Sequence, residues 1–332
     1  MPWSRSSSPS RRRDVIRPPR SGLTSSSHRV ERTLTCAAIV AALVAGACGP
    51  ASGQVHPSPT PVAVVQRPPA PSPEPTTTPA PSHVFVIVME NRSYDQAIAG
   101  RYSAQLAAQY GVATNYHGVS HPSLPNYLAM TSGSTWGVAD DGFHNLPAGG
   151  LGAQLTAAGI DWRAYMEGMT NGCFRNGNGY ALKHNPFAYY GSTCPPQVVP
   201  LSQFAHDLAG SVPRFVWITP NLCHDGHDCS TATADSWLAQ TVPAILATPA
   251  WQDNGVLFIT WDEGEDSANS VLTLVIHQDP RNHTSARAYD HYSLLASMED
   301  RLGLRRLGSA AQAVAMTDLL ERTPQPRLRT DS

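Results

Sequence analysis

Four stretches of the chain are almost continuously apolar, and three of them end abruptly in polar residues. They cover residues 84–89, 215–218, 256–261 and 271–276. Such runs are typical of strands buried on both faces of a parallel sheet, because neither face of the strand then meets water. The pattern predicts four strands in the interior of a sheet.

Between these runs, apolar residues recur at helical spacing in residues 151–158, 236–246 and 293–302. Pro243 is expected to bend or break the second helix, since proline removes one helix hydrogen bond. Gly303 is expected to end the third. Buried strands that alternate with helices predict an α/β fold in which helices sandwich a mostly parallel central sheet.

Residues 1–48 are predicted to be an export signal. Residues 36–47 are apolar and follow Arg29 and Arg32, and they fall short of the roughly 20 residues that a membrane-spanning helix needs. A basic flank before a short apolar stretch is typical of a secretory signal. Residues 45–48 resemble a bacterial lipobox, which makes Cys48 the candidate lipid site. We expect an exported protein, either a cell-surface lipoprotein whose anchor contacts the membrane or, after ordinary cleavage, a secreted one.

Residues 49–82 contain eleven prolines among mostly small residues. A stretch of this composition is expected to be a disordered, extended linker, because it has too few apolar side chains to form a core. A single folded domain is predicted over residues 83–321, and residues 322–332 are expected to be a flexible tail.

Charge argues against nucleic acid as a partner. The chain has 23 basic and 25 acidic residues, but residues 1–82 carry nine arginines and only three acids. The remainder of the chain therefore has a net charge of −8, and such a surface repels phosphate groups.

Four cysteines remain once Cys36 and Cys48 are assigned to the export signal. In an exported chain they are expected to form disulfides, for which three pairings exist. Closure of short loops favours Cys173–Cys194 and Cys223–Cys229. A zinc site is the competing interpretation, although the spacings contain no CxxC pair.

Polar residues follow two of the predicted strands. Glu90 and Asn91 follow the first strand, and Asp262 and Glu263 follow the strand at residues 256–261. Ligands in α/β sheets collect at the carboxyl ends of the strands. Three carboxylates there repel one another by several kcal/mol at an effective dielectric constant of about 20, unless a cation or strong donors hold them. These four residues are candidate ligands of a hard metal ion; ordinary solvated loops are the alternative.

Ser123 begins a helical pattern that has Pro125 in its first turn. Two interpretations stay open. Ser123 can be a helix cap, or its hydroxyl and the free N–H groups at the positive helix end can form a seat for phosphate. Asn126 would add a donor to such a seat.

Two histidines lie in polar settings near predicted element ends. His227 lies among aspartates within residues 220–229, after a buried strand, and His291 precedes the last helix. Each is a candidate phosphate contact or metal ligand, with a purely structural histidine as the alternative.

Taken in order, these segments resemble the bacterial phosphoesterase family of phospholipases C and metal-dependent acid phosphatases, within the alkaline-phosphatase-like superfamily. The similarity spans residues 83–304, and its motifs are residues 90–95, Ser123-x-Pro125-Asn126, Pro220-Asn221 with residues 225–228, residues 260–264 and residues 289–295. It implies an alkaline-phosphatase-like fold.

The resemblance implies a role for each candidate residue. Glu90, Asn91, Asp262 and Glu263 would hold a divalent metal, whose identity stays open among Ca²⁺, Mg²⁺, Mn²⁺, Zn²⁺ and iron. Ser123, activated by the metal, would attack phosphorus and form a phosphoserine intermediate. Asn126 would bind a phosphoryl oxygen. His227 and His291 would line the pocket, where a protonated histidine can donate to the leaving oxygen.

The expected protein is a monomer that hydrolyses small phosphate esters, most specifically an acid-phosphatase-like phosphomonoesterase. Tyr127 stands where the phospholipase branch typically has arginine, and little chain is left to build a lipid groove. A phospholipase C-type phosphodiesterase is the alternative. Its choline headgroup would need an aromatic cage, for which the segment 168–200 offers candidate rings: Phe174, Tyr180, Phe187, Tyr189 and Tyr190. A non-catalytic binding lipoprotein is the alternative from a different class.

Overall fold

The computed structural model of the chain describes residues 83–278 and 284–320, which lie within one compact unit. The predicted export signal with Cys48, the predicted linker and the predicted tail lie outside the described residues. None of the helices in the described part of the chain is long and apolar enough to cross a bilayer.

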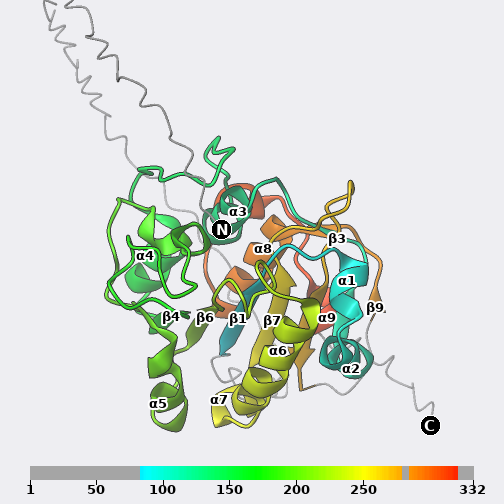
Figure 1. Cartoon of the computed structure of the whole chain (residues 1–332). Coiled ribbons are helices and arrows are strands. Elements are labelled where there is room, and N and C mark those ends of the chain that lie inside the picture. The colour runs from blue at the N-terminus through cyan, green and yellow to red at the C-terminus, as the bar shows by residue number, and fades with distance from the viewer. Residues whose placement is uncertain (1–82, 279–283, 321–332) are drawn as a thin grey trace, which may run out of the picture. The chain divides into compact units, whose positions relative to one another are not determined.

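The centre of the fold is an eight-stranded sheet with the strand order β5-β4-β6-β1-β7-β8-β2-β9 (Figure 1). Its strands are β1 (Val84–Met89), β2 (Gly111–Ala113), β4 (Trp162–Met166), β5 (Val198–Pro200), β6 (Phe215–Thr219), β7 (Val256–Trp261), β8 (Thr273–His277) and β9 (Thr284–Ser285). A separate pair of short parallel strands consists of β3 (Tyr116–His117) and β10 (Tyr289–Asp290).

The sheet is mostly parallel, as the apolar runs predict. β5, β4, β6, β1 and β7 pair in parallel, whereas β8 runs antiparallel to both of its neighbours. A return by a loop without a crossover helix explains the exception, because a parallel neighbour needs a long crossover connection. The strand expected at residues 271–276 begins two residues later, at Thr273.

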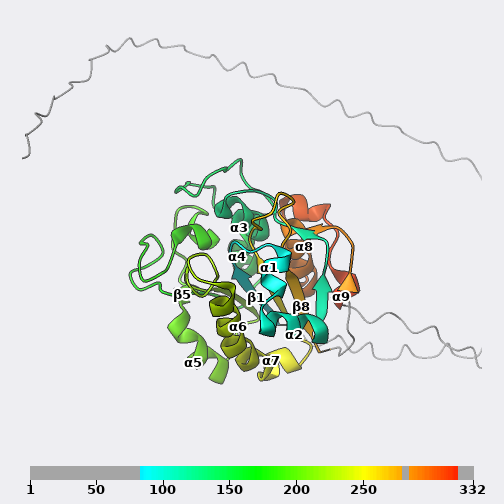
Figure 2. The ribbon, with the colours of Figure 1, turned by 45° about the vertical axis from the view of Figure 1, so that its right-hand side comes forward.

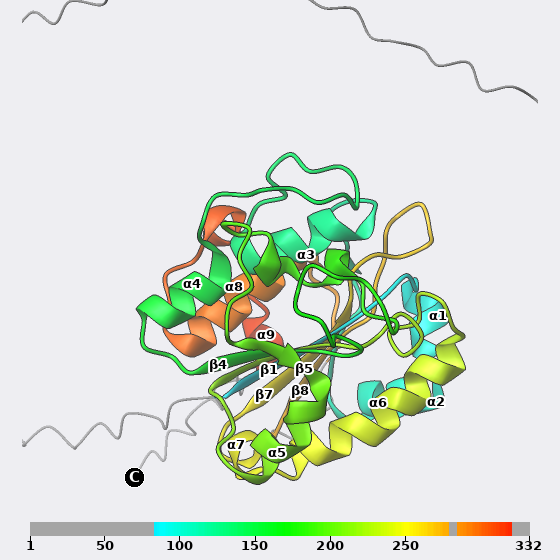
Figure 3. The same cartoon turned by 60° about the vertical axis from the view of Figure 1, so that its left-hand side comes forward.

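Helices cover both faces of the sheet. Figures 2 and 3 show α3, α4 and α8 on one side and α2, α6 and α7 on the other. The α-helices are α1 (Tyr94–Ile98), α2 (Arg101–Gln109), α3 (Ser123–Ser132), α4 (Gly150–Ala157), α5 (Phe204–Ala209), α6 (Thr231–Leu246), α7 (Pro249–Gln252), α8 (His291–Leu302) and α9 (Thr317–Leu320). Short 3₁₀ turns are η1 (Leu182–His184), η2 (Pro186–Ala188), η3 (Leu201–Gln203) and η4 (Gly308–Ala311). This arrangement confirms the predicted α/β fold.

One predicted helix differs from expectation. α6 runs without interruption through Pro243. The missing proline N–H removes one backbone hydrogen bond, but Val242 and Ile245 are fully buried on either side of it. Their burial outweighs the loss, since each such side chain contributes roughly 1.5–3 kcal/mol. Gly303 ends α8 in the left-handed region, with φ of 70°, as the sequence predicts.

The buried strands of the sheet and two disulfides hold in place the segments that carry the polar residues. Every side chain of β1 is fully buried, because strands pair with it on both edges and helices cover both faces. Both favoured disulfides are present, Cys173–Cys194 and Cys223–Cys229, so that pairing is confirmed.

Glu299 on α8 predicts a pH dependence of stability. Its side chain is buried, and Oε1 accepts a hydrogen bond of 2.9 Å from the Leu307 N–H. Burial raises the pKa of Glu299 from 4.5 to about 7. The folded state therefore binds the proton more tightly than the unfolded chain, so this contribution to stability is complete below pH 4.5 and is lost as pH rises through about 7.

We expect Glu299→Gln to raise the free energy of unfolding at about pH 8 by roughly 1–3 kcal/mol and to change it little near pH 5, because glutamine keeps the acceptor without the charge. Urea unfolding at both pH values measures this, with the exposed Glu265→Gln as the control. An equal effect of Glu299→Gln at the two pH values would contradict the assignment.

Candidate active site

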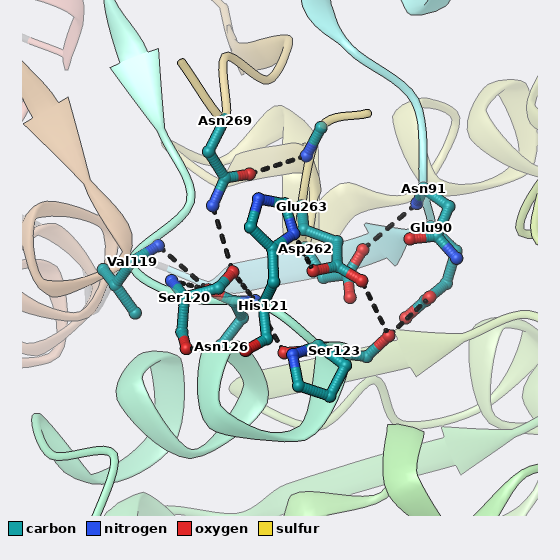
Figure 4. A network of polar contacts seen from close by, with 12 residues as sticks. Glu90, Asn91, Val119, Ser120, His121, Ser123, Asn126, Asp262, Glu263 and Asn269 are labelled. Carbon is teal, nitrogen blue, oxygen red and sulfur yellow. Dashed lines mark hydrogen bonds and ion pairs between the residues drawn. The ribbon is translucent and has the colours of Figure 1, made fainter. Parts of the chain in front are cut away.

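The candidate site lies where β1 and β7 end, facing the first turn of α3 (Figure 4). β1 and β7 pair in register from Val84 with Val256 to Met89 with Trp261. The next residue of each strand, Glu90 and Asp262, must therefore lie side by side. Both are fully buried, and the Asp262 N–H donates to the Met89 carbonyl oxygen at 2.9 Å.

Ser123 is the residue that brings α3 into the cluster. Its buried Oγ lies 3.1 Å from Glu90 Oε2 and 3.4 Å from Glu263 Oε1. The N-cap of α3 is Pro122, and Ser123 is the first helical residue. The capping interpretation is therefore wrong, because the hydroxyl points at carboxylates and not at the backbone of its own helix.

The backbone conformation after β1 holds the side chains of Glu90 and Asp262 in position. Asn91 adopts the left-handed region with φ of 48°, which asparagine tolerates better than most residues, and its N–H donates to Asp262 Oδ1 at 3.2 Å. Gly226 packs beside Glu90 with φ of 102°, and a Cβ there would lie 3.2 Å from the Glu90 carbonyl oxygen. A side chain at residue 226 would therefore push against the strand end that carries Glu90.

The electrostatics of the cluster match a cation site. Burial raises the pKa of Asp262 well above its ordinary value, and the charge of Glu90 raises it further. The pKa of Glu263 is raised by the same two causes. Asp262 Oδ2 is buried and has no hydrogen-bond partner among the described residues, which costs free energy unless a ligand satisfies it.

The four residues predicted as metal ligands are thus brought together, and their hard oxygen donors fit a divalent cation. In residues 83–278 and 284–320, no three His, Cys, Asp or Glu side chains form a ready-made metal cage. The carboxylates here turn toward the Ser123 hydroxyl and the Asn91 N–H.

Lys183 and His184, from η1, complete the site and were not predicted. Lys183 Nζ lies 3.4 Å from Ser123 Oγ, 3.0 Å from Asp141 Oδ2 and 3.3 Å from His227 Nε2. These residues belong to the 168–200 segment, which has no periodicity that would place them. Only a basic pair within a segment otherwise rich in Gly, Asn and aromatic residues hinted at them.

His184 is a buried cation between two acids. Its Nε2 lies 3.0 Å from Glu90 Oε1 and its Nδ1 lies 3.4 Å from Asp225 Oδ2. Burial alone would lower the pKa of His184, but the charge of Glu90 and the contact with Asp225 outweigh it and raise the pKa to about 9. Tyr127 stacks on the imidazole with ring centres 5.2 Å apart.

His227, His291 and Asn126 were predicted to contact phosphate, and each is already engaged by other groups of the protein. His227 is partly exposed, with Nδ1 2.7 Å from Asp228 Oδ1. His291 is fully buried; its ring nitrogens contact Tyr116 OH and the Asp262 carbonyl oxygen, and burial lowers its pKa to about 4. A neutral His291 with both nitrogens engaged supports Asp262 rather than donating a proton to a substrate.

Asn126 is occupied within its own loop. Its Oδ1 accepts from the Val119 and Ser120 N–H groups at 2.9 and 3.0 Å, and its Nδ2 donates to the Ser120 and Pro122 carbonyl oxygens at 2.9 and 3.3 Å (Figure 4). The geometry favours a role for Asn126 in holding the loop that leads into Ser123. His121 in this loop, also not predicted, contacts Glu263 Oε2 through Nδ1 at 2.6 Å.

The aromatic residues of the 168–200 segment do not form a cage. Tyr180, Phe187, Tyr189 and Tyr190 are buried in the apolar core, and only Phe174 among the five candidates is exposed. A quaternary ammonium needs several open ring faces around it, so these residues give no support for choline recognition.

The chain is similar in sequence to known proteins. The model of the Phosphoesterase family matches residues 99–305. A phosphatidylinositol-3-phosphatase of Mycobacterium tuberculosis is 32% identical over 251 residues, covering 71% of this chain and 82% of that protein. A probable acid phosphatase of Kluyveromyces lactis is 30% identical over 247 residues, covering 68% of this chain and 59% of that protein. This chain thus spans less than two thirds of the yeast relative's length.

Solved structures share the fold at low identity. A protein of the alkaline phosphatase superfamily from Vibrio parahaemolyticus superposes with a TM-score of 0.54 at 11% identity, covering 73% of each chain. A phosphonate monoester hydrolase of Agrobacterium radiobacter gives a TM-score of 0.51 at 13% identity, covering 72% of this chain and 77% of that one. The alkaline-phosphatase-like fold that the sequence motifs imply is confirmed.

The carboxylate cluster predicts stabilisation by a divalent cation. With a cation at about one hundred times its dissociation constant, linkage adds about 2.7 kcal/mol to the folded state, which corresponds to a rise in Tm of about 5–10 °C. Asp262→Asn is expected to lose at least half of this rise, because it removes one charged oxygen donor. Thermal unfolding in chelator and after addition of Mg²⁺, Ca²⁺, Mn²⁺ or Zn²⁺ measures it, with Glu265→Gln as the matched acidic control. Equal Tm shifts in wild type and Asp262→Asn for every cation would rule out this metal site.

Proposed function

This chain belongs to the phosphoesterase family, and on that basis we propose that it is an exported, metal-dependent hydrolase of phosphoric monoesters that uses Ser123 as its nucleophile. One observation carries the proposal. The buried Ser123 Oγ is held within 3.4 Å of Glu90, Glu263 and the Lys183 ammonium. No structural role of a first-turn serine requires two carboxylates and a cation around its hydroxyl.

The residues fit a metal, and Glu90, Asn91, Asp262 and Glu263 would hold it. When bound, a divalent cation would supply positive charge against the carboxylates and favour ionisation of a nearby hydroxyl. His291 holds the carbonyl oxygen of Asp262, and the Asn91 N–H holds its carboxylate. The backbone and the side chain of Asp262, one of the proposed metal ligands, are thus both held in place.

Ser123 attacks phosphorus through Oγ. Its Oγ lies 3.4 Å from Glu263 Oε1, and burial and the charge of Glu90 raise the pKa of Glu263, so Glu263 takes the proton as the Oγ–P bond forms and the bond from phosphorus to the leaving oxygen breaks. The product of this step is phosphoserine and a free alcohol. Water then attacks the phosphoserine and loses a proton to the Lys183–His227 pair, the Oγ–P bond breaks, Glu263 returns its proton to Ser123 Oγ, and inorganic phosphate is released.

Lys183 and His227 also lie beside the proposed nucleophile. The Lys183 ammonium lies close enough to Ser123 to offset charge on phosphoryl oxygens, the kind of electrostatic stabilisation that carries phosphoryl transfer. His227 Nε2 lies 3.3 Å from Lys183 Nζ, so this pair is the proposed source of the proton for the leaving oxygen. The helix end contributes less than expected, because Asp141 Oδ1 already accepts from the Leu124 N–H at 3.0 Å.

A monoester is preferred over a diester on charge. A phosphomonoester carries up to two negative charges, and Lys183 beside Ser123 together with a bound divalent cation would offer positive charge to match it. Relatives named acid phosphatase and phosphatidylinositol-3-phosphatase act, by those names, on monoesters. Export agrees with the two disulfides; lipid attachment at Cys48, a monomeric state and a small phosphate ester as substrate belong to the same proposal.

We expect Ser123→Ala to reduce turnover of p-nitrophenyl phosphate by at least about a hundredfold, with a change in the free energy of unfolding of roughly 1 kcal/mol. Ser120→Ala is the matched control, because its hydroxyl donates to the His121 carbonyl oxygen and stays out of the carboxylate cluster. Retention of more than about a hundredth of the wild-type rate would show that Ser123 is not the nucleophile. An inactive wild type that binds phosphate esters would instead indicate a binding protein.

The preference for monoesters is tested by hydrolysis of p-nitrophenyl phosphate beside bis(p-nitrophenyl) phosphate. We expect a higher kcat/KM for the monoester, inactivation of both reactions by chelation, and recovery when a divalent metal is restored. A higher kcat/KM for the diester or for phosphatidylcholine would favour the phospholipase C type. Full activity after exhaustive chelation would exclude the metal-dependent chemistry.

A further inference from the structure

Two phenylalanines lie exposed beside the candidate site. Phe143 is 53% exposed and Phe174 is 45% exposed, and their rings meet edge to face with centres 5.8 Å apart. Two large apolar side chains that touch on a surface form a small apolar patch that a ligand can cover. Together with Leu182 and Ser192 they line a cavity of about 450 Å³.

Two chain segments carry lining residues of the cavity next to residues that contact the reacting groups. Leu182 lines the cavity, and the next residue is Lys183, whose Nζ lies 3.4 Å from Ser123 Oγ. Phe143 lines it as well, and two residues before it Asp141 binds both Lys183 and the Leu124 N–H. Figure 3 shows the loop after α3 and the segment after β4 on the same side of the sheet as α3.

The lining is mostly apolar, and neighbouring contacts hold its two rings. Phe174 directly follows Cys173, which the disulfide ties to Cys194, and Phe143 packs on the buried Tyr189 with ring centres 5.5 Å apart. The polar atom of Ser192 is already bonded to Asn145 Oδ1 at 2.6 Å. Among the described residues, no charged side chain lines the cavity, so a sugar or another polyhydroxylated alcohol would lose hydrogen bonds to water there without replacement.

From this geometry we infer that Phe143 and Phe174 form a subsite for the apolar leaving group of the substrate, and that the enzyme selects phosphomonoesters of aryl alcohols over those of polar alcohols. The inference rests on the proposed function. A phosphate at Ser123 would be held by Lys183, and its ester oxygen would lead past Asp141–Lys183 to the two rings. Flat apolar groups suit this pair, because aromatic rings stack on or against one another at such distances.

The test compares kcat/KM for 2-naphthyl phosphate and glycerol 2-phosphate in wild type, Phe143→Ala, Phe174→Ala and the double variant. The ratio of the two kcat/KM values does not change when a substitution lowers the activity toward both substrates equally. We expect the aryl preference to fall about tenfold in the double variant, through KM for the naphthyl ester and not through kcat, as removal of apolar contact area predicts. Phe174→Tyr keeps an aromatic ring at this position, so its ratio should equal that of the wild type.

Trp136→Ala is the matched control, since Trp136 is also exposed but does not line the cavity; its ratio should not change. Competitive inhibition by benzylphosphonate and 2-hydroxyethylphosphonate gives a second measurement that needs no turnover of the apolar compound. The Ki ratio should shift in the same direction and by a similar factor.

An unchanged ratio in the double variant, with glycerol 2-phosphate still cleaved through Ser123, would overturn the subsite and leave the proposed function intact. If the double variant keeps the ratio but no longer binds phosphatidylcholine vesicles, the group that covers Phe143 and Phe174 is a lipid surface and not the leaving group. Failure of the proposed function has a different signature, which is that Ser123→Ala does not alter turnover of either substrate.

Discussion

Mutual repulsion among Glu90, Asp262 and Glu263 is the constraint around which the rest of the site is arranged. The register of β1 and β7 forces the first two side chains together at a buried sheet edge, where like charges cost most. Segments distant in sequence supply the compensation: η1 brings Lys183 and His184, and α3 brings a hydroxyl donor. In the proposed enzyme, a divalent cation would supply the remaining positive charge. The positive and hydrogen-bonding groups that stabilise the buried acids thus surround Ser123. The same groups would stabilise a phosphate dianion bound next to this hydroxyl.

The parts of the fold that local pattern determines could be predicted. The strands are continuous apolar runs, and because parallel strands end at one edge, the residues that follow them could be placed together from the order of the residues alone. Helix ends were less certain. Ser123 was also compatible with a capping role, because capping depends on which residue begins the helix, a difference of one position. Pro243 was expected to bend or break α6, but the helix is not broken there, because tertiary burial of its neighbours outweighs one lost hydrogen bond.

Residues whose role depends on the path of an irregular segment could not be predicted. Lys183 and His184 lie in a three-residue 3₁₀ turn between irregular stretches, and no periodicity marks such residues. The histidines illustrate the same limit. His184 is buried against two acids and held cationic, whereas His291 is buried against a carbonyl and a tyrosine and held neutral. Sequence reveals that both are histidines, but only their neighbours decide the charge.

Chemistry and selectivity rest on separate parts of this structure. The carboxylates are mounted on β1 and β7, whose buried side chains leave no freedom to shift without loss of core packing. The apolar pair belongs to two surface loops, of which one is closed by Cys173–Cys194. Lys183 and Asp141 join the two parts, because each contacts the site while its neighbours in sequence reach the cavity. Exposed rings can therefore be exchanged at little cost in stability, so under the proposed mechanism the accepted leaving group would change while the position of Ser123 would not.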